Sequence, residues 1–600
     1  MSLTSLDYGI IIGFFALILF IGIYVSKSSG KNSTEYFLSG RNMPWWLLGF
    51  SMVATTFGAD TPLLVADIVR QNGVAGNWVW WAFLLTGMLT VFVYAKLWRK
   101  SNVKTDIEFY ELRYSGKPAT FLRGFRALYL GVIFNVLVMS VVTLAAIKIG
   151  GVMLGIQPWE VVLYAGTITV IFSAIGGFKG VVYTDFILFF VAMIGAIGAA
   201  YYILNLPQVG GLKSLLENEI VLTKISLLPD FNNTELLITL LVIPLTVQWW
   251  SAWYPGSEPG GGGYVAQRML AAKNENHAIG ATFFFNILHY ALRPWPWILV
   301  ALASLVIFPD IASLQTAFPH IEEGKLGHDL AYPAMLNFLP AGLLGLVLAS
   351  LIAAYMSTIS SHLNWGSSYM VNDFYKRFVK PEASEKELVN IGRISTVLLM
   401  VLSSLLALTF NNALQVFNVI ILFGAGTGLL FILRWFWWRI NAWSEISAMV
   451  SSGIISLLAE KYSDVLFGVD TFFPAWSKYP LVVLITTLIW VIVTYVTSPE
   501  KQKTLENFYQ KIQPSILGWK PVILSAEKKG INIVNKSEKN DVPSGILAMV
   551  FGTILVYSVL FATGNFIYGN FKLAFILVFI IIVTTIILIK LWNKIKSTSF

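Results

Sequence analysis

The chain of 600 residues contains no cysteine, and only 12% of its residues are charged, whereas 56% are hydrophobic. Without cysteine there is no disulfide framework, no thiol chemistry and no cysteine-based metal site. Soluble proteins carry about a quarter of their residues as Asp, Glu, Lys and Arg. A chain so poor in charge could not hide its apolar surface from water, so the composition excludes an ordinary soluble protein.

Apolar runs of about 20 residues recur along the whole chain, as expected for helices that cross a membrane. The first run has Asp7 ahead of it and no preceding basic segment, which predicts a retained span rather than a cleaved signal peptide. We predict 15 spans, near residues 6–26, 44–70, 76–96, 127–155, 158–178, 181–205, 235–256, 264–308, 338–365, 389–409, 414–434, 444–460, 479–497, 544–566 and 572–592.

Lys and Arg lie mostly in alternate loops. Counted from the loop after the first span, one set of alternate loops holds 31 of these residues and the opposite set holds 7. Because short basic loops stay in the cytoplasm, this asymmetry predicts an N-terminus outside the cell and a C-terminus inside. The net charge of +9 is spread over these short loops and does not indicate a nucleic-acid partner. The chain is therefore expected to be a multi-pass protein of the cell membrane.

Two of the predicted spans are interrupted by glycine and proline. The second contains Gly58, Asp60 and Pro62, and the seventh runs into Pro255 and four glycines at 260–263. Unwound backbone at membrane depth is tolerated only where it is buried in protein or lines a polar cavity. Such breaks at corresponding places in two halves indicate a transporter built from inverted repeats, with its site near the midplane. For the seventh span, a simple loop that ends the helix is the alternative.

Five polar residues stand out in apolar surroundings. Four hydroxyls lie within five positions of one span, at Ser357, Thr358, Ser360 and Ser361. Hydroxyl oxygens at this density suit a hard cation such as sodium, although they could instead bond to their own or a neighbouring helix. Asp185 begins another apolar run, where an acid costs about 2.5–3.5 kcal/mol on insertion scales and indicates a functional site. A helix N-cap is the alternative for Asp185.

Three segments, in this order, are similar to motifs of the sodium:solute symporter family. They read G-G-F-K-G-V-V-Y-T-D at 176–185, Y-V-A-Q-R-M-L-A-A-K at 264–273 and A-Y-M-S-T-I-S-S-H-L-N at 354–364. The resemblance extends over residues 6–497. It implies an all-α polytopic membrane protein with a LeuT-like repeat of five plus five helices, to which peripheral helices are added.

This architecture divides the chain into seven expected parts. They are a peripheral first span and cytoplasmic loop (1–43), a first five-helix repeat (44–205), an extracellular loop (206–234), a second five-helix repeat (235–440), peripheral helices (441–497), a cytoplasmic linker (498–543) and two C-terminal helices (544–600). The linker is predicted to be solvated, with a regulatory docking segment as the alternative.

The resemblance also implies a main sodium site between two helices. Backbone carbonyls of Ala54 and Phe57, freed where the second span unwinds, would face the carbonyl of Ala354 and the hydroxyls of Ser357 and Thr358. Neutral oxygens of this kind would bind sodium weakly enough to release it again.

A second sodium site is implied for those family members that carry two ions. Here it would consist of Asp185, Ser360 and Ser361. We hypothesise two sodium ions per cycle. At 100 mV two charges supply about 4.6 kcal/mol, enough to concentrate a neutral solute by roughly three decades.

The substrate pocket departs from that of the sugar carriers in the family. Asp60 and Thr61 align with a Glu-Gln pair in those carriers, and His289 lies near their pocket lysine. Glu258 aligns with an aromatic gate in those carriers, a role that could be taken over here by Trp249, Trp250, Trp253 or Tyr254. Carboxylates here could accept hydrogen bonds from a polyol, bind an ammonium group, or pair with Arg293 and never contact the substrate. The candidate substrate-binding residues are thus Asp60, Thr61, Glu258, His289, Arg293 and Trp253.

The predicted function is sodium-coupled symport of a small polar organic solute by alternating access, with a sugar or polyol favoured over an amino acid. A transporter-like membrane sensor and a membrane-embedded enzyme are the alternatives. We find no zinc-protease, G-x-S-x-G or phosphate-loop motif, so an enzyme is not expected. No cofactor is implied. The expected partners are sodium ions, the solute and the lipid bilayer, and the oligomeric state stays open.

Overall fold

The computed structural model describes residues 3–26, 32–56, 58–251, 258–411, 420–422, 424–468, 471, 473–535 and 542–595. Within these ranges the regular structure is helical, and two isolated bridges join residues 43 to 272 and 467 to 473. Helices are expected because lipid offers backbone groups no hydrogen-bond partners. Eleven of the described helices are long and apolar enough to cross a membrane.

The difference from the 15 predicted spans has local causes. The second span is a bent pair, α3 (Trp45–Thr55) and α4 (Asp60–Asn72), with 59° between its halves. Two further predicted spans correspond to apolar helices below the length criterion, Pro158–Ala174 and Thr234–Gln248. The span predicted near 414–434 lies partly outside the described residues.

The first half of the fold follows the predicted order. A kink at Gly177, where φ is 56°, divides α11 into the two spans that the sequence predicts. A left-handed φ of this kind favours glycine. After the pair α3 and α4, this half consists of α5 (Trp78–Trp81), α6 (Leu84–Leu89), η3 (Thr90–Tyr94), α7 (Ala95–Ser101), α8 (Phe109–Arg113), α9 (Gly116–Leu128), η5 (Tyr129–Phe134), α10 (Asn135–Leu154) and α11 (Pro158–Leu204).

In the second half, one helical segment ends at Gln248 and another begins at Gly263. Gly260 and Gly261, just before the latter, have φ values of 89° and 87°, and a Cβ on Gly260 would lie 2.9 Å from the Tyr94 ring, so both positions favour glycine. The helices of this half are α14 (Thr234–Leu237), η6 (Ile238–Val242), η7 (Pro244–Gln248), α15 (Gly263–Ala271), α16 (Glu275–Ile287), η8 (Leu288–Leu292), α17 (Trp295–Ile307), α20 (Leu343–Tyr369), η11 (Met370–Val379), α21 (Glu385–Ala407) and α23 (Gly428–Leu433).

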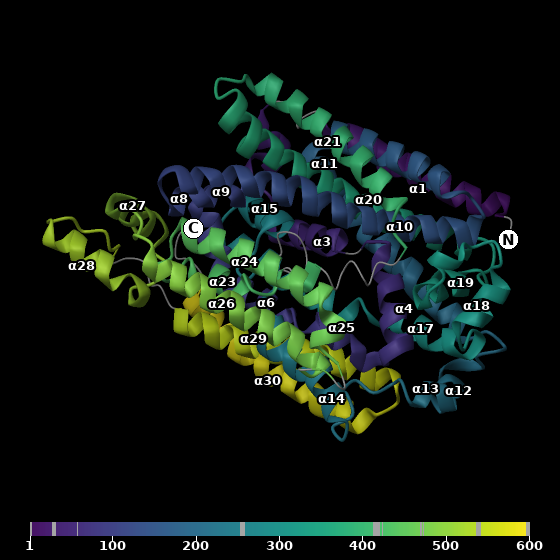
Figure 1. The fold of residues 1–600 in the computed structure, drawn as a ribbon. Coiled ribbons are helices and arrows are strands. Elements are labelled where there is room, and N and C mark those ends of the chain that lie inside the picture. The colour runs from purple at the N-terminus through teal and green to yellow at the C-terminus, as the bar shows by residue number, and fades with distance from the viewer. Residues whose placement is uncertain are drawn as a thin grey trace.

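The core is built around α20, which is buried along almost its whole length. It packs against α11, α10, α21 and the first helix, α1 (Ser5–Ser26), and these five helices run side by side in Figure 1. Small residues permit the close approach: a Cβ on Gly195 would lie 2.6 Å from the Ser350 hydroxyl oxygen. The hydroxyls and Asp185 are thereby held inside protein.

Peripheral helices cover the opposite side of the molecule. They are α24 (Ala442–Lys461), α26 (Lys478–Val496), α29 (Val542–Ile567) and α30 (Phe571–Ile595), and the last two form a hairpin, in the yellow-green to yellow colours of Figure 1. The hairpin packs on α6, and the Tyr557 hydroxyl donates a hydrogen bond of 2.9 Å to the carbonyl of Trp81, the last residue of α5.

The segment expected as a linker, 498–543, contains two helices, α27 (Gln502–Ile512) and α28 (Lys520–Lys528). Between them, Trp519 stacks on Phe508 with 5.4 Å between ring centroids. The Trp519 indole N–H donates to the Trp435 carbonyl at 3.0 Å, and the Arg113 guanidinium lies 4.8 Å from the Trp519 ring. The segment therefore packs on the transmembrane part of the chain through Trp519.

Candidate ion and substrate site

The end of α3 and the middle of α20 lie against each other. The Thr358 hydroxyl donates a hydrogen bond of 2.8 Å to the Thr55 carbonyl, at the point where α3 ends. Ala54, Ala354 and Ser357 are each no more than 2% exposed. The structure therefore brings together the two helices of the predicted main sodium site. Phe57, also predicted there, lies outside the described residues.

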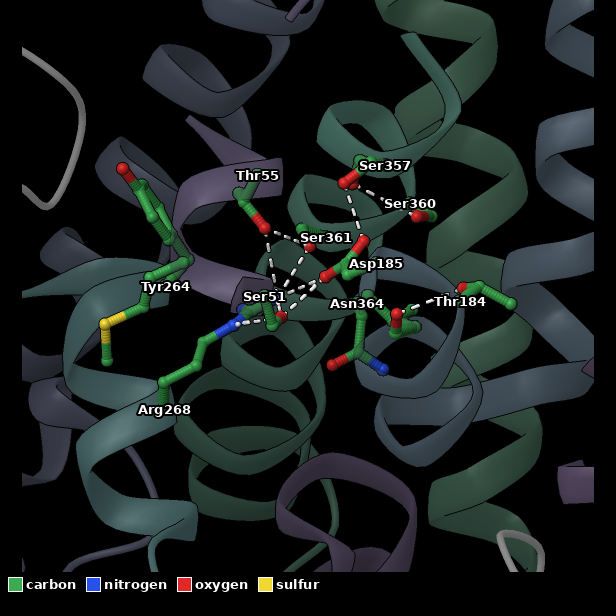
Figure 2. A network of polar contacts seen from close by, with 12 residues as sticks. Ser51, Thr55, Thr184, Asp185, Tyr264, Arg268, Ser357, Ser360, Ser361 and Asn364 are labelled. Atoms are coloured by element: carbon green, nitrogen blue, oxygen red, sulfur yellow. Dashed lines mark hydrogen bonds and ion pairs between the residues drawn. The ribbon is translucent and has the colours of Figure 1, made fainter. Parts of the chain in front are cut away.

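Asp185 projects from the second half of α11 toward both of these helices (Figure 2). Its Oδ1 accepts a hydrogen bond of 2.6 Å from Ser357, and its Oδ2 accepts one of 2.5 Å from Ser51 of α3. The carboxylate is completely buried. Because a buried acid without partners would be costly, these two hydroxyls stabilise its charged form.

Arg268, on α15, reaches into the same cluster. Its Nη2 donates to the hydroxyls of Ser361, Ser51 and Thr55, at 2.6, 3.1 and 3.3 Å, and lies 3.7 Å from Asp185 Oδ2. Figure 2 shows the guanidinium pointing at the carboxylate across Ser51. The cluster thus pairs one buried cation with one buried anion.

The predicted second sodium site is placed only in part as expected. Ser361 bonds to Thr55 at 2.7 Å and to Arg268, on the same side of α20 as the carboxylate. The Ser360 hydroxyl instead donates to the carbonyl of Ser357 at 3.2 Å, within its own helix. Among the described residues there is no group of three or more His, Asp and Glu side chains that could hold a metal ion.

Glu258 precedes α15 and takes part in a buried charge network. It forms ion pairs with Arg126 of α9 and with Arg434, the latter at 3.5 Å. Arg434 also lies 3.5 Å from Glu445, which accepts a hydrogen bond of 2.5 Å from Tyr114. The sequence offered Arg293 as the partner of this carboxylate, whereas the described contacts are to two other arginines.

A small cavity of about 30 Å³ lies between the span that contains α6, the start of α15 with the residues just before it, and the helix of α16 and η8. By volume it could hold about two water molecules. The amide oxygen of Asn286 has no hydrogen-bond partner among the described residues, and a Cβ on Gly87 would clash with it at 1.8 Å. The lining residues are Phe83, Thr86, Gly87, Thr90, Glu258, Gly261, Tyr264, Val265, Thr282, Phe285, Asn286 and Tyr290.

The described residues among the other substrate predictions do not line this cavity. Asp60 and Thr61 begin α4 and are partly exposed. His289 is buried between the rings of Trp80 and Phe285, at centroid distances of 5.7 and 5.3 Å. Arg293 Nη1 lies 3.4 Å from the Val53 carbonyl. Trp253 lies outside the described residues.

Four polar residues that line the cavity are not among the predicted site residues. Thr86 and Thr90 are four residues apart in one span, and Thr282 and Asn286 are four apart in another, so each pair lies on one helix face. Polar residues with helical spacing in apolar spans are a detectable signal. In the sequence, Arg268 appears only as a position of the family motif at 264–273, with no predicted role of its own.

Comparison with known proteins agrees with this architecture. The model of the sodium:solute symporter family matches residues 36–452. A sodium/glucose cotransporter of Vibrio parahaemolyticus is 26% identical over 75% of this chain and 84% of its own length. A sodium/mannose cotransporter of Bos taurus is 27% identical over 73% of this chain and 76% of its own. A sodium/myo-inositol cotransporter 2 of Homo sapiens is 26% identical over 75% and 69%.

A solved structure shows the same fold. The substrate-bound outward-open state of a Na⁺-coupled sialic acid symporter aligns with a TM-score of 0.65, at 21% identity, over 83% of this chain and all of that one. Together with the broken second span, this likeness shows a LeuT-like transporter fold, and the protein is a multi-pass membrane protein. Because the family model matches well over half of its residues, the chain belongs to the sodium:solute symporter family.

Proposed function

We propose that this protein couples the inward movement of sodium to the uptake of a neutral sugar or polyol by alternating access. The contact between the broken end of α3 and the hydroxyls of α20 is the observation that carries the proposal. Relatives named as glucose, mannose and myo-inositol cotransporters support the choice of solute. Transport of this kind needs no covalent step, and we propose none.

The main sodium site in this proposal consists of carbonyl oxygens of Ala54 and Ala354 with the hydroxyls of Ser357 and Thr358. The Thr358 hydroxyl already contacts the Thr55 carbonyl, next to Ala54. Oxygen ligands suit a hard cation. The carbonyl of Phe57 is also included in the proposed site, on the basis of the sequence alone.

The solute site in this proposal is the cavity next to Glu258. Threonine hydroxyls and the Asn286 amide oxygen can exchange hydrogen bonds with sugar hydroxyls, and the unpaired amide oxygen offers an acceptor. Because the cavity of about 30 Å³ is far smaller than a hexose, solute binding requires the surrounding helices to separate. We keep Asp60, Thr61, His289 and Arg293 as candidates for contacts in the opened pathway.

The charge around Glu258 favours a neutral solute over an amino acid. Its carboxylate pairs with Arg126 and Arg434, so its charge is balanced inside the protein. An ammonium group would have to displace one of these arginines. A sugar hydroxyl can add a hydrogen bond without doing so.

Uptake into proteoliposomes tests the proposal. The purified full-length protein is reconstituted, and uptake of labelled glucose, mannose, myo-inositol and proline is compared under an inward sodium gradient and an equal potassium gradient. We expect one of the first three solutes to accumulate only with sodium. Accumulation of proline alone, or equal uptake with potassium, would contradict the proposed function.

A further inference from the structure

We propose that a groove between α3, α16 and α30 binds one anionic phospholipid, with an acyl chain in the groove and the phosphate at a basic rim that contains Lys273 and His277. The groove encloses about 490 Å³, which is within the range of roughly 300–1,000 Å³ for ligand pockets. It shares no lining residue with the cavity next to Glu258. The inference therefore goes beyond the proposed function and does not depend on which solute is transported.

The walls of the groove are mostly aromatic. Phe283 and Phe284 of α16 lie between Trp45, the first residue of α3, and Trp592, near the end of α30. Trp45 meets Phe284 edge-on with 5.5 Å between ring centroids, and Trp592 lies 6.0 Å from Phe283. Trp45 is 42% exposed, and only 17% of the spanning part of α30 is buried. The groove thus opens on a surface that faces lipid, and an acyl chain matches its apolar walls.

The two tryptophans place the groove at the level of the lipid headgroups. Tryptophan is enriched where a span meets the membrane surface. Trp45 begins its span and Trp592 is close to the end of its own, and both line one groove. The charges of the loops predict that this side is cytoplasmic. The cytoplasmic leaflet carries the anionic lipids.

His277 supplies a hydrogen-bond donor at the rim. Its Nδ1 accepts a hydrogen bond of 3.0 Å from the backbone N–H of Trp45. The proton of the neutral ring is therefore on Nε2, which can donate to a phosphate oxygen. The backbone N–H of His277 donates to the side chain of Asn274 at 3.0 Å, and this cap fixes the first turn of α16, which carries the ring.

The rim also carries a net positive charge. Lys273 is exposed, and its backbone N–H donates to the Met43 carbonyl at 3.0 Å, which holds it beside the start of α3. Arg99 is anchored at the same place, because its Nε donates to the Ala272 carbonyl at 2.7 Å. Against these two cations, residues 272–277 contain one carboxylate, Glu275. Basic residues next to a span attract anionic lipids, so the rim favours a phospholipid with a net negative charge.

One wall of the groove is an addition to the part of the chain that the family model matches. That part ends at residue 452, whereas α30 begins at Phe571. Trp592 packs on Phe92 of η3 as well, with 6.3 Å between ring centroids. A phospholipid in the groove would join the C-terminal hairpin to α3, whose other end carries Ala54.

Native mass spectrometry of the purified, delipidated full-length protein tests the proposal. The dissociation constant of the first bound lipid is measured for dioleoyl phosphatidylglycerol, which is anionic, and for dioleoyl phosphatidylcholine, which has no net charge. We expect the anionic lipid to bind more tightly. Lys273→Gln should weaken its binding roughly fivefold, the factor expected for one basic residue near the membrane surface. Equal affinity of the wild type for the two lipids would overturn the proposal.

A matched control separates the rim from a general effect of charge. Lys213→Gln removes a lysine that is 90% exposed on α12 (Gly211–Glu217), away from the groove. We expect it to bind phosphatidylglycerol as the wild type does. The same loss in both variants would show that the anionic lipid responds only to net charge, and the rim would have no role.

Filling the groove tests the place of the acyl chain. Gly280 lines the groove, and a Cβ on it would lie 3.4 Å from the Trp45 Cβ, so a larger side chain can enter the space. We expect Gly280→Leu to weaken the first binding event at least tenfold for both lipids. Gly13→Leu is the control, because Gly13 is exposed on α1 and no atom lies within 4 Å of its added Cβ. Wild-type affinity in folded Gly280→Leu would contradict the assignment.

A headgroup without chains distinguishes a lipid from a soluble anion. Glycerol 3-phosphate, added at the concentration that half-saturates the protein with phosphatidylglycerol, should not displace the lipid. Displacement would show a site for a soluble phosphate and would overturn the proposal. Since no sodium and no solute enter these measurements, their outcome is separate from that of the uptake experiment.

Discussion

The Ser357 hydroxyl donates a hydrogen bond of 2.6 Å to Asp185, which joins the middle of α20 to the second half of α11. Both side chains are fully buried. Ser357 belongs to the proposed main sodium site and Asp185 to the candidate second site, so the two sites form one continuous network. A change at either residue is therefore expected to affect both.

Removal of the Ser357 hydroxyl should weaken sodium binding. We expect Ser357→Ala to raise the sodium concentration for half-maximal uptake by about tenfold, the ratio that corresponds to a lost ligand worth about 1.4 kcal/mol. Uptake as a function of sodium concentration measures this. Ser367→Ala is the matched control, because Ser367 is equally buried and, among the described residues, its hydroxyl donates to the Asn364 carbonyl of its own helix. An unchanged sodium dependence in Ser357→Ala would count heavily against the main site.

Gly87 is expected to be intolerant of even one methyl group. A Cβ at this position would lie 1.8 Å from the amide oxygen of Asn286, so Gly87→Ala must displace the amide that lines the cavity. We expect at least a tenfold loss of sugar uptake while sodium binding stays within about twofold, since a displacement that removes one hydrogen bond is worth about 1.4 kcal/mol. Gly180→Ala is the control, because no atom lies within 4 Å of its added Cβ. Equal uptake by the two variants would remove Asn286 from the proposed solute site.

The charge of Glu258 should be needed for stability. Glu258→Gln leaves Arg126 and Arg434 without this buried counter-charge, and breaking a buried pair costs about 3–5 kcal/mol. We expect a clearly lower melting temperature for the purified protein. Glu322→Gln breaks an ion pair of an exposed glutamate with Lys325 and should change stability by no more than about 1 kcal/mol. Similar melting temperatures for both variants would show that the network contributes little.

Glu111, on α8 outside the membrane-spanning segments, should make stability depend on pH. Burial alone would raise the pKa of this carboxyl, but hydrogen bonds and charge from Arg377 and Arg123 hold it below its ordinary value of 4.5. A lowered folded-state pKa gives a stabilisation that is present above pH 4.5 and is lost as the pH falls through the lowered value. We therefore expect Glu111→Gln to melt below the wild type at pH 7 and the difference to shrink below pH 4.5. A constant difference from pH 7 to pH 3.5 would contradict the linkage.

The membrane class, the broken second span and the family could be predicted from the sequence because each has a local cause. The length of a span is set by the thickness of the bilayer, and interrupted helices are indicated by glycine and proline within an apolar run. The hydroxyl-rich segment of α20 can also be recognised in the sequence, because the residues before it are mostly apolar.

The contacts between different spans could not be predicted from the local sequence. The sequence placed Arg268 in a motif, and only packing of α15 against α3, α11 and α20 brings its guanidinium to Asp185. Likewise, the partners of Glu258 lie more than 100 residues away on either side, at Arg126 and Arg434. The sequence by itself determined that the chain crosses the membrane many times and which residues are chemically unusual there. The tertiary structure alone decided which of these residues meet, because pairing inside the membrane depends on how whole helices pack and not on distance along the chain.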